Sequence, residues 1–484
     1  MYTSLNKNLT QLRLMFADSA DLTIRELRLR SDKNALAALI TIEGMCDKEV
    51  LAASVMNPLL AFDFGSKTGD ELAASVRGSV LSSAEMIEVI DFDEAANYAV
   101  SGFAVLAFDG SKKMLAVGVQ GYAFRGVEEP ESEVVQRGSR EGFCEPLRIN
   151  MSLIRRRIKS PDLVFELMSV GEKSKTQLML CYLKSRASEK LIQTVRTRVG
   201  NCDLEAVLGA GYLSEYLEDD GGKSIFSGVG ISERPDTVCG KLIEGRIAVI
   251  VDGTPAVMIV PRLFVEEFQA VDDYSNRPYY ATFIRALKYM AIIVSVYLPG
   301  IYTAFAQYHP EYFPTWILIK TSESISHTPL PVTLEVLLIA FVYEIMKEAG
   351  LRIPKSLGHA VSIVGALVIG ESAVNAGIIS ASTLMVVAVA AICSYVTSPL
   401  YPPVMTLRFL FIIVGGMIGL WGIVLASCVV VINMCSKTSL GIPYLSSLSP
   451  FAPRTMRDVV LRAPWKTLSK HTIRVQNFPE TEDE

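Results

Sequence analysis

The amino-acid sequence predicts a cytoplasmic α/β region of two related subdomains, followed by an α-helical domain that crosses a membrane several times. Up to Tyr280 the apolar segments are short and separated by charged residues, as in a globular protein. From Ala281 to Met434 long apolar runs follow one another, whereas no charge-free stretch long enough to span a bilayer occurs earlier. One order of strands and helices also occurs twice before Tyr280. The function should therefore couple a soluble region to a membrane.

The composition excludes several classes of protein. The 484 residues carry a net charge of −5, and no basic stripe with interleaved aromatics precedes Tyr280, so no nucleic-acid partner is expected. The eight cysteines form no CxxC pair, and none of the four histidines lies near a cysteine, so we expect no metal site and no cofactor. Because the N-terminus lacks the layout of a signal peptide, the α/β region should stay in the cytoplasm with reduced cysteines.

The first elements of the α/β region are repeated. Apolar residues at helical spacing over 5–16 predict an amphipathic N-terminal helix. A strand over 37–42 and a helix over 47–56 follow. About 141 residues later the same order returns, with a strand over 177–183 and a helix over 188–199. This agreement favours a duplication.

Two hairpins support the duplication. Gly102–Gly110 and Gly245–Gly253 each read as a strand that ends in Asp-Gly, and each precedes another apolar run. We interpret Asp109 and Asp252 as residues that tolerate positive φ in the turns, rather than as catalytic carboxylates. The predicted units are a helix over 1–24, subdomains over 25–140 and 161–280, a basic connecting helix over 141–160, a membrane domain over 281–434 and a basic cytoplasmic tail over 435–484.

No motif of the α/β region indicates an enzyme. The run from Gly221 to Ser224 resembles the end of a phosphate-binding loop, but Leu217 stands where the Walker A pattern requires glycine. No GxSxG, HExxH or Rossmann fingerprint occurs. We therefore expect no catalytic residues.

Three consecutive arginines stand between the two subdomains. Arg155, Arg156 and Arg157 are flanked by isoleucines and could bind a phosphate or an acidic partner surface. The alternative is a solvated helix face that forms surface ion pairs.

Five apolar segments can be drawn in the membrane domain: Ala281–Phe305, Val332–Met346, Leu357–Ile379, Leu384–Leu400 and Phe409–Met434. The second is short and contains two glutamates, so we interpret 332–346 as a re-entrant or interfacial helix. The missing export signal and the basic tail place both ends in the cytoplasm, which gives about four crossings. Lys347, Arg352 and Lys355 oppose this orientation; six crossings, with the glycine-rich fifth segment split, would remove the conflict.

Ionisable residues at membrane depth are costly and usually face a cavity or a partner. Glu371 is the best example, with Ser372 and Asn375 after it and small residues before it. These residues suit a narrow water-filled path, and the alternative is a protonated glutamate that bonds to a neighbouring helix. Glu335 and Glu344 could line a mouth or contact another subunit.

Dense motifs between residues 140 and 453 resemble those of a known family. They are Arg140–Asn150 with Leu153–Lys159, Val170-Gly, Ser174–Thr176, Glu233–Asp236, Leu242–Arg246, Val251–Pro255, Tyr308–Glu311, Glu344 with Glu348–Gly350, Val361–Gly370 and Gly441–Tyr444. The chain resembles the GerA family, the A subunits of bacterial spore nutrient-germinant receptors.

The resemblance implies a cellular location and partner subunits. Such a protein would lie in the inner membrane of the dormant spore, facing the spore core with both ends, together with a transporter-like B subunit and a C lipoprotein. It would form oligomers and contribute to a nutrient-gated cation channel that triggers germination, and it would not be an enzyme. Within that picture we assign Glu371 and Asn375 to the pore wall. The alternative is a non-conducting scaffold beside the spore dipicolinate-release channel. A secondary transporter and a membrane-anchored enzyme find less support in the sequence.

Overall fold

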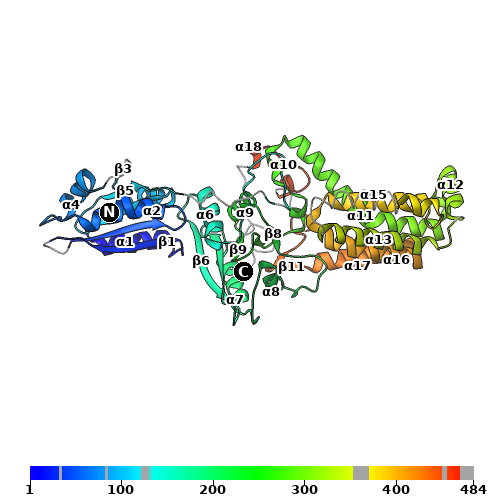
Figure 1. The fold of residues 1–484 in the computed structure, drawn as a ribbon. Coiled ribbons are helices and arrows are strands. Elements are labelled where there is room, and N and C mark those ends of the chain that lie inside the picture. Colours follow the sequence, from blue (N-terminus) through cyan, green and yellow to red (C-terminus); the bar gives the residue numbers. More distant parts are fainter. Residues whose placement is uncertain are drawn as a thin grey trace.

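The computed structural model describes residues 1–31, 35–81, 85–121, 130, 132–326, 328–352, 370–449 and 455–468. Two α/β units and a bundle of helices follow one another along a single long axis (Figure 1). This arrangement confirms the predicted fold class: a duplicated α/β region followed by an α-helical region.

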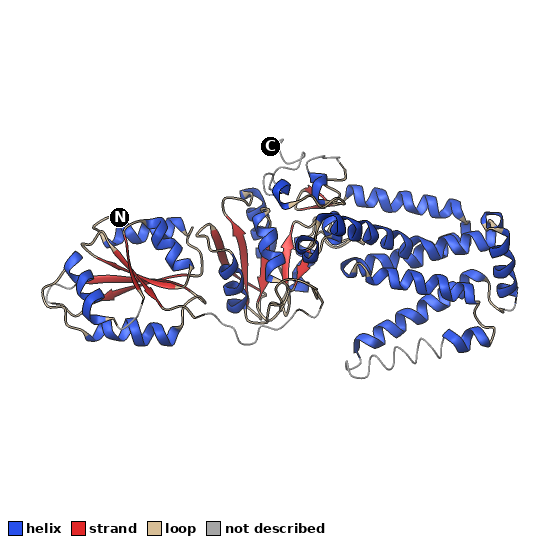
Figure 2. Ribbon diagram, turned by 90° about the horizontal axis from the view of Figure 1, so that it is seen from above, coloured by secondary structure: helices blue, strands red, loops and turns tan. Residues whose placement is uncertain are grey.

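The first unit is an antiparallel sheet with helices on both faces, as the view from above also shows (Figure 2). Its strands have the order β1-β2-β4-β5-β3. The elements are α1 (Leu5–Met15), β1 (Leu22–Arg28), β2 (Leu36–Ile42), α2 (Lys48–Leu51), α3 (Asn57–Ala61), α4 (Gly69–Ser75), β3 (Met86–Val89), α5 (Phe92–Val100), β4 (Phe103–Phe108) and β5 (Met114–Gly118). One core joins α1 and α5 to the sheet, and a second core fills the opposite face. The almost continuous apolar character of β2 and β4 follows from this burial on both faces.

The second unit repeats this topology, with the strand order β6-β7-β9-β10-β8. Its elements are α6 (Leu147–Arg157), β6 (Leu163–Val170), β7 (Thr176–Leu183), α7 (Glu189–Gly200), α8 (Ser214–Leu217), β8 (Gly230–Ser232), α9 (Pro235–Ile243), β9 (Ile247–Val251) and β10 (Val257–Val260). The helix α6 holds the place that α1 has in the first unit. The basic segment over 141–160 therefore contains the first helix of the second unit, and it also connects the first unit to the second.

The aspartates of the two hairpins have the same role in both units. Asp109 accepts a hydrogen bond from the backbone N–H of Leu5 at 3.0 Å, and Asp252 accepts one from Leu147 at 2.9 Å. The positive φ of each turn belongs to the glycine that follows, with φ of 84° and 82°. The interpretation that the aspartates themselves adopt positive φ was therefore wrong. Each carboxylate instead stabilises the positive end of the first helix in its unit.

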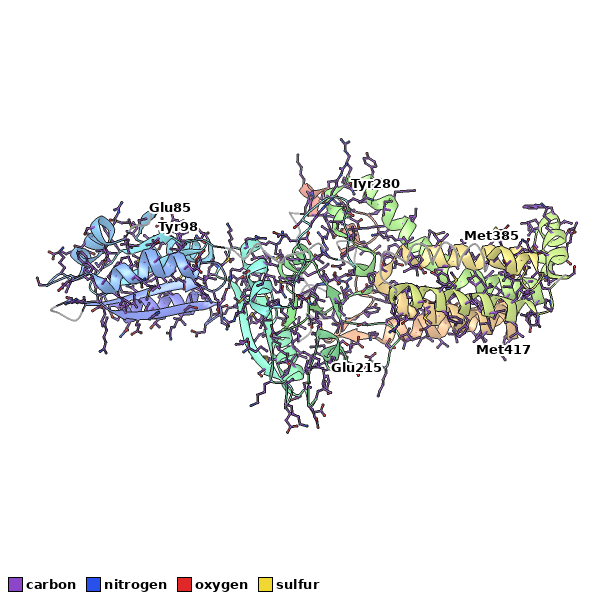
Figure 3. All side chains as sticks on the ribbon, in the orientation of Figure 1. Glu85, Tyr98, Glu215, Tyr280, Met385 and Met417 are labelled. Atoms are coloured by element: carbon purple, nitrogen blue, oxygen red, sulfur yellow. The ribbon has the colours of Figure 1, made fainter. Side chains whose placement is uncertain are left out.

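The helical region begins after the short helices η4 (Phe264–Phe268) and α10 (Val271–Ser275). It consists of α11 (Pro278–Tyr308), α12 (Thr315–Ser326), α13 (Val332–Arg352), α15 (Ala381–Tyr395), η6 (Ser398–Leu400), α16 (Tyr401–Ile418) and α17 (Leu420–Ser436). In the described ranges, two helices are long and apolar enough to cross a membrane: Pro278–Tyr308 and Ser398–Ile418. Side chains such as Met385 and Met417 point outward from the bundle (Figure 3).

Contacts between residues give the relative directions of two pairs of helices. Ser295 contacts Arg408, and Gly300 lies against Gly415, so α11 and α16 run parallel. Glu335, near the start of α13, bonds to Ser380, immediately before α15. These two helices therefore begin at the same end of the bundle.

Two predicted segments differ from the structure. The proposed fifth segment over 409–434 is two helices, the split that the six-crossing alternative supposes, because the chain reverses at Gly419 with φ of 74°. The proposed short segment over 332–346 continues as a regular helix to Arg352. Much of the third segment, including His359, lies outside the described residues, and so does Lys355 before it.

The chain returns to the second unit after α17. The short strands β11 (Thr438–Ser439) and β12 (Ile442–Pro443) and the helices η7 (Thr455–Asp458) and α18 (Trp465–Leu468) follow. Leu440, Ile442 and Val459 join the core around α7 and β9. The first and last helices of the bundle therefore both meet the second unit.

Candidate functional site

One arginine connects four helices inside the bundle. Arg408 of α16 is completely buried. Its Nε and Nη2 donate to the backbone oxygen and the hydroxyl of Ser295 in α11, at 3.1 and 2.6 Å. Nη2 also donates to the backbone oxygen of Ala390 in α15, and Nη1 lies 3.7 Å from the carboxylate of Glu344 in α13. Removing this side chain would leave partners on three helices unpaired.

The predicted fifth apolar segment starts at Phe409, so Arg408 would lie just outside it. The actual helix begins at Tyr401, so the arginine stands well inside it. The sequence does contain a signal for this earlier helix start, because Pro402 and Pro403 are typical of the first turn of a helix. With that start, a lone arginine inside an apolar helix predicts a buried polar partner.

Two of the three glutamates of α13, Glu335 and Glu344, face other helices of the same chain. The Tyr401 hydroxyl donates to Glu344 at 2.5 Å, beside the Arg408 pair. Glu335 is completely buried and accepts a hydrogen bond from the backbone N–H of Ser380, the N-cap of α15. A carboxylate in this place stabilises the positive end of the helix.

The predicted pore residues lie elsewhere. Residues 370–375 are helical and precede α15. Glu371, Ser372 and Asn375 are all exposed on the single chain. The structure therefore separates Glu371 from the internal pair that Glu344 forms with Arg408.

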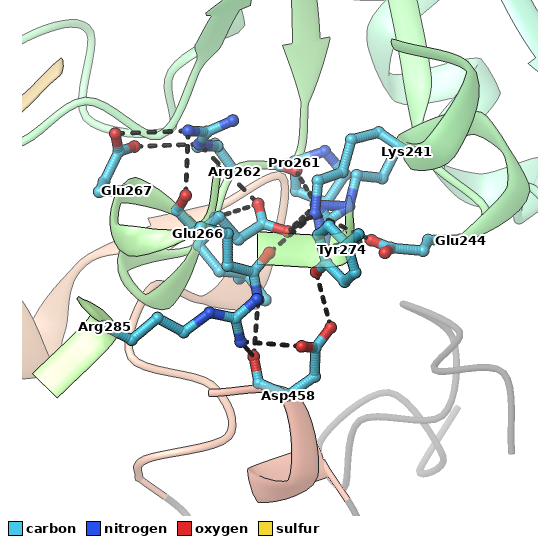
Figure 4. Close-up of polar contacts among 12 residues, drawn as sticks. Lys241, Glu244, Pro261, Arg262, Glu266, Glu267, Tyr274, Arg285 and Asp458 are labelled. Carbon is cyan, nitrogen blue, oxygen red and sulfur yellow. Dashed lines mark hydrogen bonds and ion pairs between the residues drawn. The ribbon is translucent and has the colours of Figure 1, made fainter. Parts of the chain in front are cut away.

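A second polar network joins α11 to the soluble region (Figure 4). Arg285 is completely buried and donates through Nε to Asp273 of α10 at 2.7 Å. Its Nη1 donates to the Asp458 carboxylate at 2.8 Å and to the Asp458 backbone oxygen at 2.7 Å. The Tyr274 hydroxyl donates to the same carboxylate at 2.8 Å. Arg285 thus holds together the start of the bundle, α10 and the C-terminal segment.

A third carboxylate, Glu266 of η4, pairs with basic residues of the second unit. Glu266 lies 2.8 Å from Lys241 of α9 and 2.5 Å from Arg246, and it is almost completely buried. Burial alone would raise the pKa of Glu266, but the charges of Arg246, Lys241 and Arg262 outweigh it and lower this pKa to about 2. The carboxylate is therefore charged at every physiological pH.

The last helix of the bundle has its own connection. Lys437, directly after α17, is buried between Asp220 and Glu218 of the second unit, at 3.0 and 3.5 Å. The N–H of Gly441 donates to Asp219 at 3.0 Å. Lys437 thus fastens the end of the bundle to the second unit, whereas Arg285 fastens its start to α10 and to the C-terminal segment.

A cavity of about 1050 Å³ borders this junction. Its walls come from the second unit, from residues 132–135, from α10 and α11, from residues 396–403 around η6 and from the C-terminal segment. Arg262, Lys288 and Tyr444 are among the lining residues. Because both the second unit and the bundle contribute to the walls, a shift of one relative to the other would change this space.

The three consecutive arginines at the end of α6 are all engaged within the chain. Arg155 is completely buried and pairs with Asp21 of the first unit at 2.7 Å. It cannot reach an external phosphate, so the partner role considered for it does not fit the fold. Arg156 and Arg157 both pair with Glu141, at 2.5 and 2.6 Å. A basic run that appears solvated in the sequence therefore connects parts of the protein.

The parts of the chain that the structure describes hold no group of three or more His, Cys, Asp or Glu side chains arranged for a metal ion. The charged clusters above are pairs of acids with bases, which serve to fix helices and units relative to one another.

Several known proteins are similar in sequence to this chain. The family model described as "Bacillus/Clostridium GerA spore germination protein" matches residues 10–473. Spore germination protein KA of Bacillus subtilis is 35% identical over 464 residues, which cover 96% of this chain and 85% of that protein. The protein called uncharacterized membrane protein YfkQ, also of B. subtilis, is 36% identical over 471 residues, covering 96% and 90% of the two chains.

A solved structure is similar to the soluble part. The crystal structure of the N-terminal domain of the A subunit of the Bacillus megaterium spore germinant receptor GerK3 aligns with a TM-score of 0.42 and 27% identity. The alignment covers 55% of this chain and 97% of that one. From the match of the family model along nearly the whole chain, we conclude that this protein is a member of the GerA family of spore germination proteins.

Proposed function

We propose that this chain is the A subunit of a nutrient germinant receptor, and that several copies form a cation-conducting path in the spore inner membrane. The transporter-like B subunit and the C lipoprotein are the expected partners, as the family resemblance implies. Nutrient binding would open the path, and the loss of cations would begin germination. Both ends of the chain would face the spore core.

The observation that carries this proposal is the exposed polar stripe of Glu371, Ser372 and Asn375. The bundle around it exposes large apolar side chains, including Met385, Ile392, Trp421 and Leu425. The apolar side chains can face lipid, but burying a glutamate and an asparagine in lipid would cost several kcal/mol of free energy. Glu371 and Asn375 would stay hydrated if copies of the chain turned this stripe toward a shared water-filled path.

The connections of the bundle support the proposed orientation. Arg285 ties the start of α11 to α10, directly after the second unit, and Lys437 ties the end of α17 to the second unit itself. Because both ends of the bundle meet one soluble unit, an even number of crossings is expected. The soluble region and the tail would then share one side of the membrane.

Cation release from spores tests this function. Spores with Glu371→Gln or Asn375→Leu should release cations at an altered rate after nutrient addition, or leak them without nutrient, at normal protein level. The control is Glu323→Gln, which changes another exposed acid at the far end of the bundle on α12. Wild-type release in both pore variants would contradict the conducting role and favour a scaffold.

A further inference from the structure

The first turns of α11 expose an apolar face beside the junction. Five side chains form it: Tyr279, Tyr280, Phe283, Leu287 and Met290. At 3.6 residues per turn they fall within an arc of about 100° on one side of the helix. Tyr279, Phe283 and Met290 are 72%, 63% and 60% exposed. Figure 3 shows Tyr280 at the outer edge of the junction, pointing away from the protein.

The C-terminal segment extends this face. The backbone N–H of Arg462 donates to the hydroxyl of Thr282 at 3.0 Å, which fixes the segment against α11. Leu461 and Trp465 of the same C-terminal segment are 63% and 58% exposed. The indole of Trp465 donates to the backbone oxygen of Tyr274 at 3.3 Å, so its orientation is fixed as well. We call the five side chains of α11, together with Leu461 and Trp465, the interfacial face.

Basic side chains lie next to the members of the interfacial face along the chain. Arg277 lies one residue before α11, and Arg457 and Lys466 lie in the C-terminal segment; all three are exposed. Aromatic residues with a polar tip, combined with lysine and arginine, are typical of protein surfaces at the headgroup level of a bilayer. Negative lipid headgroups complement this charge.

The length of α11 gives the depth of the face. Its 31 residues extend over about 46 Å, whereas the hydrocarbon core of a bilayer is about 30 Å thick. If α11 crosses the bilayer, about ten residues must lie outside the hydrocarbon. At the end that meets the soluble region, those are the turns that carry Tyr279, Tyr280 and Phe283.

We propose that the interfacial face lies in the headgroup layer and binds anionic phospholipid, through its aromatic side chains and through Arg277, Arg457 and Lys466. This inference rests on the proposed membrane location and adds a lipid ligand to it. The Arg285 network lies directly behind the face, because Arg285 and Thr282 share the first turns of α11. Bound lipid would therefore stabilise the contact between the α/β region and the bundle that Arg285 forms.

Tryptophan fluorescence in liposomes tests the proposal, because the chain has only three tryptophans, Trp316, Trp421 and Trp465. The full-length protein with Trp316→Phe and Trp421→Phe reports on Trp465 alone. The protein with Trp316→Phe and Trp465→Phe reports on Trp421, which is exposed on α17 within the bundle. Both are reconstituted with spin-labelled lipids, the label being on the headgroup or on the acyl chain, at increasing fractions of phosphatidylglycerol.

Trp465 should be quenched by the headgroup label, and the quenching should increase with the fraction of phosphatidylglycerol. Arg457→Gln with Lys466→Gln should raise the fraction needed for half-maximal quenching at least about fivefold, since one basic residue near the surface contributes about that factor. Lys7→Gln with Lys112→Gln, two exposed lysines of the first unit, should leave this fraction unchanged.

Two results would overturn the proposal in distinguishable ways. In the first, Trp421 is quenched and Trp465 is not, or phosphatidylglycerol has no effect on Trp465. The chain is then inserted in the bilayer, but the interfacial face contacts another protein or the solvent instead of anionic lipid. If Trp421 is not quenched either, the proposed membrane location itself fails, and the lipid site fails with it.

Discussion

Buried arginines hold this protein together, and each of them joins segments that are distant in the sequence. Arg155, Arg285 and Arg408 are completely buried, and each has a carboxylate as its partner. A planar guanidinium with five donors can serve several acceptors at once, which suits the meeting point of three or four elements. Removing one partner of a buried pair is costly, because the other charge stays buried without compensation.

Arg155→Met tests the joint between the two α/β units. The substitution leaves Asp21 buried and removes the donors for the backbone oxygens of Ser160 and Leu163. We expect a loss of about 3–5 kcal/mol in the free energy of unfolding. Thermal unfolding of the detergent-solubilised protein, followed by circular dichroism, should show a clearly lower midpoint. Lys173→Met, which removes an exposed pair with Glu205, is the control and should change the midpoint little.

The pH dependence of stability should follow Glu266. Its pKa in the folded protein is about 2, below the ordinary value of about 4.3 in an unfolded chain. The charged pair therefore stabilises the fold fully above about pH 4.3, and this contribution is lost as the pH falls toward about 2. The thermal midpoint should decrease over this window, and Glu266→Gln should flatten the decrease. An unchanged slope would contradict the assignment; Glu205→Gln, in an exposed pair, is the matched control.

At the scale of elements, glycines decide how closely the helices of the bundle approach. A Cβ atom added to Gly300 of α11 would lie 2.6 Å from the backbone oxygen of Phe411, and one added to Gly415 of α16 would lie 2.5 Å from that of Gly300. The two backbones are thus in direct contact, as small residues allow in membrane helix pairs. The interpretation of the glycine-rich stretch as one long helix missed this role.

Gly300→Ala and Gly415→Ala should each push α11 and α16 apart. The Arg408 contacts with Ser295 lie one to two turns away and should weaken with the displacement. The thermal midpoint of the detergent-solubilised protein should decrease in both variants. Gly350→Ala in α13 is the control, since its added Cβ meets no described atom within 4 Å and alanine favours a helix by up to about 1 kcal/mol. Equal behaviour of the three variants would contradict the close contact.

At the scale of the whole molecule, the two α/β units and the bundle are joined in series. Asp21 and Arg155 connect the first unit to the second. Lys437 connects the bundle to Glu218 and Asp220 of the second unit, and Arg285 connects it to α10 and to the C-terminal segment. In the linear arrangement of Figure 1, the second unit lies between the first unit and the bundle.

Arg285→Met should uncouple the soluble region from the bundle without unfolding either. Hydrogen exchange should increase in α10 and in the C-terminal segment, where Asp273 and Asp458 lose their partner. Nutrient-triggered cation release should decrease in spores that carry the variant at normal protein level. Arg352→Met removes an exposed arginine at the end of α13 and should change neither measurement. Increased exchange throughout the bundle would instead indicate a general loss of stability.

The sequence by itself determined the family, the duplicated α/β region and the change to long apolar helices, because these depend on local patterns and dense motifs. It did not determine which charges are paired. Arg285 and Asp458 are 173 residues apart, and only the return of the chain from α17 to the second unit brings them together. The same holds for Arg155, which resembles a solvated residue in sequence and is buried against Asp21 in the fold. Burial and pairing are properties of the tertiary structure, since they depend on neighbours that no local window contains.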